Sequence, residues 1–204
     1  MSAGDLAVLI ADKNIEGALR GLLSRPRSLG LREISCDFYV HPERDPGCRL
    51  RGHDFLRSFA HRYEHALIVF DREGSGRTVE RAALEREVEA RLSSSGWDDR
   101  AAAVVIDPEL EIWVWTDSPH VATVLGWQSP EKPLTEWLRE KGWLPEGKTK
   151  PSQPKAAVEE ALRLARRPRS SSIYHQLAQR VSTSGCVDPA FLKLRQTLSR
   201  WFSR

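Results

Sequence analysis

HALIVF (residues 65–70) is a continuous apolar run that ends in the polar triplet DRE (residues 71–73). A short run of this kind, bounded by polar turn residues, is typical of a strand buried on both faces of a parallel sheet. The same pattern recurs in LAVLIA (residues 6–11) and in AAAVVI (residues 101–106). Apolar side chains alternate at residues 33–40, which predicts one further strand.

Helical patterns separate these four runs. The spacing of apolar residues predicts helices at residues 15–23, capped by Asn14, at residues 54–61 and at residues 78–94. The polar segment 41–52 contains two prolines and is predicted to be a loop. Strands that alternate with helices form βαβ units, so the sequence predicts an α/β fold in which helices flank a four-stranded, mainly parallel sheet.

The chain changes character after residue 107. Residues 109–115 could form a helix or a strand. Helices are predicted at residues 118–125, 134–141, 154–167, 172–181 and 189–202, with Asp188 as the N-cap of the last. A polar hinge begins near residue 148. We therefore predict an α/β domain at residues 1–147 and an all-helical extension at residues 148–204.

The composition indicates a globular protein of the reducing cytoplasm. Of 204 residues, 40% are hydrophobic and 29% are charged, which is ordinary for such proteins. The three cysteines are widely spaced and odd in number, which argues against a disulfide framework or a CxxC metal site. No apolar run approaches the length of a membrane span, and the N-terminus does not look like a signal peptide. We expect no membrane association and a cytoplasmic location.

The net charge of +3 conceals an uneven distribution. Residues 148–204 contain 12 Lys/Arg against 3 Asp/Glu, whereas residues 1–147 contain 19 against 25. A basic extension on an acidic body suggests a polyanionic partner, but a solvated basic surface is an equal alternative. Four arginines cluster around a proline and are candidates for binding nucleic-acid phosphates or an acidic protein partner: Arg163, Arg166, Arg167 and Arg169.

Three of the predicted strands end in acidic residues. Asp12 follows the first, Asp71 and Glu73 follow the third, and Asp107 follows the fourth, while Glu16 lies one turn into the first helix. Functional groups of parallel sheets gather beyond the carboxyl ends of the strands, where clustered carboxylates recruit a hard cation such as Mg²⁺. Aspartate is also common where a strand enters a turn, so a structural role remains an alternative.

The order of these parts resembles the TOPRIM fold of topoisomerases, primases, nucleases and small bacterial phage-defence proteins. LIADKNIE (residues 9–16) places Asp12 at the family's first acidic position, and DRE (residues 71–73) falls at its Asp-x-Asp pair. PELEIW (residues 108–113) resembles a stretch of a defence-associated subfamily. Here the first acid is Asp where the family has Glu, and the pair is Asp-x-Glu.

This resemblance implies a nuclease that depends on Mg²⁺ or Mn²⁺ and belongs to a bacterial anti-phage defence system. It implies catalytic roles for Asp12, Glu16, Asp71 and Glu73, and metal binding by Asp12, Asp71 and Glu73. Nucleic acid and other defence proteins are the expected partners, and homo-oligomerisation is left open. Because some family members only bind or regulate, a non-catalytic adaptor with a degenerate acidic site is the alternative.

The sequence offers three uses for the five tryptophans between residues 113 and 143. They could stack on bases or contact a partner protein, which would suit the adaptor, or they could pack in a core, which is the commoner use. A nucleotide-binding domain is a weaker alternative, because the glycine segment GSG (residues 74–76) lacks both the Walker and the dinucleotide patterns.

Overall fold

A four-stranded, all-parallel sheet forms the centre of the molecule, with strand order β2-β1-β3-β4. The computed structural model describes residues 4–128, 132–183 and 185–204. The four apolar runs form the strands, which confirms the predicted α/β fold: β1 (Gly4–Ile10), β2 (Cys36–Val40), β3 (Tyr63–Asp71) and β4 (Ala101–Ile106). β1 and β3 lie in the middle of the sheet, and β1, β3 and the edge strand β4 are each largely buried.

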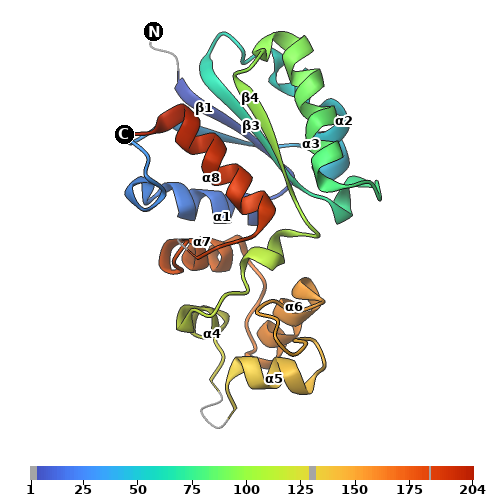
Figure 1. Cartoon of the computed structure of the whole chain (residues 1–204), viewed down its shortest axis with the longest axis vertical. Coiled ribbons are helices and arrows are strands. Elements are labelled where there is room, and N and C mark those ends of the chain that lie inside the picture. The colour runs from blue at the N-terminus through green and yellow to red at the C-terminus, as the bar shows by residue number, and fades with distance from the viewer. Residues whose placement is uncertain (1–3, 129–131, 184) are drawn as a thin grey trace.

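Helices cover both faces of the sheet (Figure 1). One face carries α2 (Arg44–Arg57) and α3 (Arg81–Leu92), and the other carries α1 (Lys13–Leu23) and α8 (Pro189–Phe202). Apolar side chains from both layers join the strands in one core cluster. The sheet is therefore the middle layer of three.

The predicted loop at residues 41–52 is largely helical, and this correction matters for the site. Residue 44 already begins α2, so Pro46 and Gly47 occupy its first turn. Proline is tolerated there because the first backbone N–H groups of a helix have no partner within the helix. Gly47 is required because a Cβ at this position would lie 2.0 Å from Nδ1 of the buried His41 side chain.

Two other helix starts differ from the prediction. Asp12, rather than Asn14, caps α1, with Oδ1 accepting hydrogen bonds from the backbone nitrogens of Asn14 and Ile15. The third helix begins at Arg81, a few residues later than predicted, because the short 3₁₀ helix η2 (Glu73–Ser75) and an irregular segment precede it. The predicted cap of α8 is confirmed, since Asp188 accepts from the Phe191 nitrogen at 3.0 Å.

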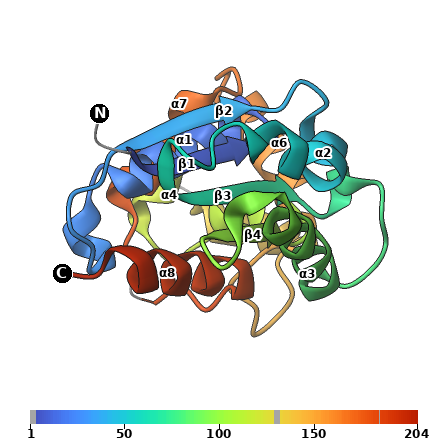
Figure 2. The same ribbon diagram turned by 90° about the horizontal axis from the view of Figure 1, so that it is seen from above.

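The short helices η1 (Pro26–Leu29) and η3 (Ser93–Trp97) follow α1 and α3, and a further group of helices lies around the carboxyl ends of the strands (Figures 1 and 2). They are the 3₁₀ helix η4 (Leu110–Trp113), then α4 (Pro119–Leu125), α5 (Leu134–Glu140), α6 (Pro154–Leu164) and α7 (Ser171–Arg180). α7 packs along α1, and α8 returns to β4. The boundary proposed at residues 147/148 stays a prediction, but two helices beyond it contact the α/β layers directly.

α1 and α7 approach so closely that only glycine fits between them. A Cβ at Gly17 would lie 2.3 Å from the Ser171 carbonyl oxygen, and one at Gly21 would lie 2.5 Å from the His175 carbonyl oxygen. Both obstacles are backbone atoms, which cannot rotate away. The two glycines, one helical turn apart, therefore determine how near α7 comes to the sheet layer.

The tryptophan-rich segment packs largely against itself and its surroundings. The ring centroids of Trp127 and Trp137 are 5.0 Å apart, and those of Trp137 and Trp143 are 5.8 Å apart. The indole nitrogen of Trp115 donates to the Pro154 carbonyl, and that of Trp113 donates to Asp188. These contacts favour the packing role. Among the described residues, no helix is both long and apolar enough to cross a membrane.

Candidate functional site at the carboxyl edge of the sheet

The sheet brings Asp12 and Asp71 to the same level of one edge. Ile10 on β1 pairs with Val69 on the neighbouring strand β3, and the two aspartates each follow two residues later. From β1 the chain goes outward to β2 and then returns to β3, so these aspartates flank the point where the strand order reverses. Ligands of open α/β sheets bind at such points.

Asp71 is the most perturbed carboxyl of the edge. Its Oδ1 atom is buried and has no hydrogen-bond partner among the described residues. Burial raises its pKa well above the ordinary aspartate range, and the neighbouring carboxylates of Asp45, Glu111 and Asp12 raise it further. A backbone hydrogen bond from Leu110 opposes this rise only in part. The arrangement therefore favours either a neutral side chain or a cation beside it.

Asp45 joins the site from the first turn of α2, a position that the sequence reasoning missed because it expected a loop. Its Oδ1 accepts a hydrogen bond from the Asp71 backbone nitrogen at 2.8 Å. Burial raises the pKa of Asp45, and Asp12 adds to the rise. Gly74 packs against this carboxyl, since a Cβ there would lie 2.4 Å from Asp45 Oδ2. The glycine after β3 therefore makes room for a second acid at the edge.

The other predicted acids lie around this cluster. Glu16 accepts hydrogen bonds from Lys13 at 2.6 Å and from Arg20 at 2.8 Å. Burial acts to raise the pKa of Glu16, but these two cations outweigh it and lower the pKa. Asp107 is paired with Arg72 at 2.6 Å. Both carboxylates therefore already have cationic partners within the chain.

Glu73, the second acid of the DRE triplet, lies farther out. Its side chain is exposed, and its backbone nitrogen donates to the Pro108 carbonyl at 3.0 Å. Burial raises the pKa of Glu109, and the charge of Glu73 adds to the rise. Glu73 therefore faces the β4 side of the edge, and it is not among the main charges that act on Asp71.

Two cations from the C-terminal helical part reach the acidic edge. Lys155 lies 3.1 Å from Glu109. Arg169 contacts the buried Glu111, which also accepts a hydrogen bond from the Tyr174 hydroxyl. In the sequence, Glu111 was noted only as part of the segment PELEIW. The structure shows that it pairs with Arg169 and Tyr174 and that its charge acts on Asp71. The basic part of the chain thus neutralises acids of the body.

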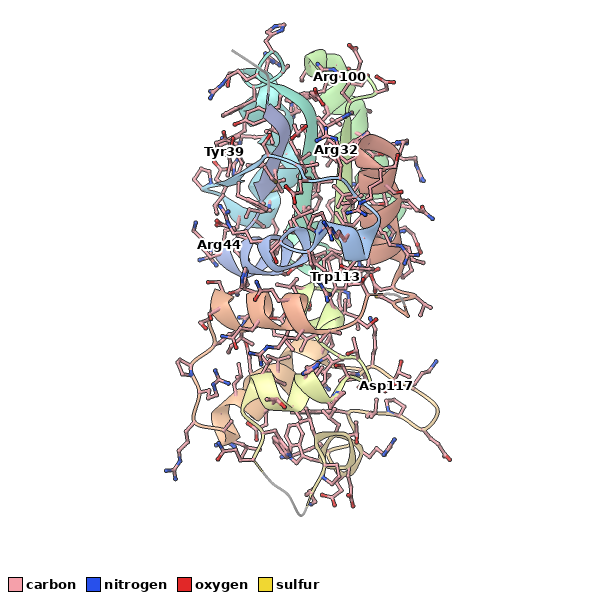
Figure 3. All side chains as sticks on the ribbon, turned by 90° about the vertical axis from the view of Figure 1, so that its left-hand side faces the viewer. Arg32, Tyr39, Arg44, Arg100, Trp113 and Asp117 are labelled. Carbon is pink, nitrogen blue, oxygen red and sulfur yellow. The ribbon has the colours of Figure 1, made fainter. Side chains whose placement is uncertain are left out.

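An open crevice adjoins Asp12 at this edge. Its described lining includes three cationic residues, Lys13, Arg44 and Arg169, together with Asn14 and His41. Figure 3 shows Arg44 beside α1. Cations next to an acidic cluster suit a ligand that carries a phosphate, because the phosphate can contact the cations and share a metal ion with the carboxylates.

The four predicted phosphate-binding arginines have different surroundings. Arg169 lines the crevice. Arg163 is paired with Glu160 at 2.7 Å, and Arg167 donates to the Val124 carbonyl at the end of α4. Arg166 is exposed and adopts a left-handed backbone conformation, with φ of 52°. Arg169 is therefore the member of this set that the fold brings to the candidate site.

The donors at this edge fit a sparse Mg²⁺ site better than a dense protein cage. Within residues 4–128, 132–183 and 185–204, no group of three or more His, Cys, Asp or Glu side chains is arranged to hold an ion. Mg²⁺ commonly uses one or two carboxylates and takes its other oxygens from water and substrate phosphate. The unpartnered Oδ1 of Asp71 is a suitable donor, with Asp12 and Asp45 in the same cluster.

Comparisons of the chain with protein-family models, with curated proteins and with solved structures found no match.

Proposed function

We propose that this protein performs Mg²⁺- or Mn²⁺-dependent phosphodiester chemistry on nucleic acid at the carboxyl edge of its sheet. The observation that carries the proposal is Asp71, a carboxyl with a buried, unpartnered oxygen among three other acids. Burying an uncompensated carboxylate is costly, and active sites are where proteins retain such groups. A hard cation would offset the charge of the whole cluster.

Each residue of the candidate site has a proposed role that follows from its position. Asp71 and Asp12 would hold the metal, Asp45 would add negative charge beside them, and Asp12 would also exchange a proton with a group bound in the crevice that it lines. A bound Mg²⁺ would polarise the scissile phosphoryl group. Lys13, Arg44 and Arg169 would bind the flanking phosphates. Glu16, held by Lys13 and Arg20, would keep Lys13 in place, and Glu73 would lie at the rim.

The proposed setting is a bacterial anti-phage defence system in the cytoplasm. It derives from the TOPRIM-like order of the acidic residues, and it includes other defence proteins as partners. The TOPRIM family has Glu where this chain has the shorter Asp12. Within the proposal, the additional carboxylate of Asp45, which lies near Asp12, would compensate for this difference.

Binding and cleavage can be tested on the same preparations. Mg²⁺ and Mn²⁺ are titrated into the purified chain while its thermal unfolding is followed, and each metal is then added to duplex DNA, single-stranded DNA and RNA. We expect the metals to raise the melting temperature and to support cleavage, and Asp71→Asn to abolish both effects. Asp107→Asn is the matched control, because Asp107 lies at the same edge but is paired with Arg72.

The adaptor remains the second candidate, and a specific observation favours it. Asp12 Oδ1 already caps α1, and Glu111 is already paired with Arg169 and Tyr174. If neither metal stabilises the wild-type chain and no substrate is cleaved, the acidic edge is structural, and the adaptor is the better proposal. If a metal stabilises the chain but no substrate is cleaved, the result would support the metal site and indicate that cleavage requires a partner protein.

A further inference from the structure

An apolar cavity lies between α1, η4, α7 and residues 181–183 and 186, which follow α7. Figure 3 shows Trp113 at this level, where the sheet layers meet the helices below. Most of the lining is hydrocarbon or aromatic, with contributions from Ala18, Leu22, Leu110, Trp113, Leu177 and Phe191. The residues come from distant parts of the sequence, so sequence patterns gave no indication of the cavity.

Arg25 places a positive charge in these surroundings. It is the one described lining residue with a fully charged side chain. Its Nη2 donates to the Val181 carbonyl, but its Nε is buried and has no acceptor among the described residues. Burial lowers the pKa of this guanidinium. An incompletely paired cation against apolar walls costs free energy of folding, and a bound anion would recover it.

We propose that this cavity binds a small apolar monocarboxylate, a hydrocarbon or aromatic body with one carboxylate that pairs with Arg25. A single guanidinium compensates a single negative charge, and its planar fork of donors matches the two oxygens of a carboxylate. The described walls offer no second cation for a doubly charged phosphate. Trp113, Tyr174 and Phe191 supply aromatic surfaces for the body of the ligand.

The cavity shares a wall with the acidic edge but does not depend on its chemistry. Leu110 and Trp113 line the cavity, while Glu111 lies between them in η4, and the Leu110 nitrogen bonds to Asp71. The Tyr174 ring lines the cavity and its hydroxyl donates to Glu111. The proposal does not rest on the nuclease function, so its test requires no nucleic acid.

The cavity contains its own reporter. The full chain is labelled with 5-fluorotryptophan, and the resonance of Trp113, one of seven tryptophans, is assigned by its loss in Trp113→Phe. Benzoate and octanoate are then titrated, with neutral benzamide as the matched control. We expect the carboxylates to shift the Trp113 resonance saturably, with benzamide binding about tenfold or more weakly because it lacks the charge-assisted bond.

Substitution of the cation completes the test. Arg25→Met should weaken benzoate binding about tenfold or more and leave benzamide unchanged. Arg27→Met, two residues away and exposed, should alter neither. The comparison of benzoate with benzamide on the wild-type chain needs no variant, so it holds even if Arg25→Met folds poorly. No saturable shift at Trp113, equal binding of benzamide, or unchanged benzoate binding in a folded Arg25→Met protein would overturn the proposal.

Discussion

Asp71 shows how the surroundings of one residue decide what its carboxyl does. Its position after an apolar run was enough to predict a place at the edge of the sheet. The crowding by Asp45 and Glu111 comes from tertiary structure. Because burial and these neighbours raise the folded-state pKa of Asp71, its ionisation opposes folding. That cost is absent below the unfolded-state pKa, near 3.8, grows as pH rises from there towards the raised folded-state pKa, and is fully present above it.

Asp71→Asn should therefore stabilise the metal-free protein at neutral pH. The amide keeps the shape and can still accept the Leu110 hydrogen bond, but it removes the buried charge. We expect a gain of about 1 kcal/mol or more, which is about 2–4 °C in melting temperature at this chain length. The gain should shrink as pH falls towards 4, where the wild-type side chain is itself neutral. Thermal unfolding in EDTA across this range measures it.

Asp107→Asn is the control for this experiment. Its carboxylate is paired with Arg72, so the variant should be unchanged or slightly less stable at neutral pH. If Asp71→Asn were instead less stable than the wild type at every pH, the Asp71 carboxylate would have a stabilising partner, and its proposed unpaired state would be wrong.

Only the part of the acidic site that directly follows the strands could be predicted from the sequence. Asp12 and Asp71 follow apolar runs, so their arrival at one edge follows from a parallel sheet. Asp45 lies in a segment whose proline and glycine indicated a loop, and Glu111 acquires its role only through Arg169 and Tyr174. Contacts between residues about 60 positions apart leave no local pattern.

At the level of elements, apolar patterning was a good guide to the strands and a poor one to α2. Buried parallel strands are apolar on both faces, so their runs stand out. α2 has no comparable apolar stripe, and its first turn contains the residues that normally mark a turn. The contact between α1 and α7 could not be predicted either, because a glycine in a helical pattern does not indicate which element packs against it.

Gly17→Ala and Gly21→Ala should each destabilise the protein by about 1–3 kcal/mol. Alanine favours the helix by about 1 kcal/mol, but each new methyl group would collide with a carbonyl oxygen of α7. Gly52→Ala in α2 is the matched control, because its methyl would meet the end of the Ile68 side chain, which can rotate. Urea unfolding compares the three. Equal stability of all three variants would show that α1 and α7 are not held in close contact.

Across the whole molecule, the basic C-terminal part has its own acidic partners. Lys155 pairs with Glu109, Arg169 with Glu111, and Lys193 lies 2.7 Å from Glu89. The charge asymmetry of the sequence is thus partly an internal match between two regions of the fold. What remains exposed, such as Arg166, is available to a polyanion. The helices at both ends of the chain also share one core.

This shared core predicts cooperative unfolding. Tryptophan fluorescence, which mainly reports the segment from Trp113 to Trp143, and far-UV circular dichroism should give coincident urea transitions. Leu194→Ala in α8 should shift both by about 2–5 kcal/mol. The exposed Leu164 provides a control, for which alanine should change stability by less than about 0.5 kcal/mol. Two separate transitions would instead support independent domains on either side of residue 147.

The close seating of α7 on α1 has a consequence for biosynthesis. The glycine-lined surface of α1 leaves the ribosome about 150 residues before the helix that covers it. At ordinary elongation rates of about 5–20 residues per second, that delay is about 8–30 s. Once β4 has been made, α2 and α3 can cover one face of the sheet, while the other face still lacks α8 and the glycine surface of α1 still lacks α7. The nascent chain should therefore be a good client for chaperones that bind apolar surfaces.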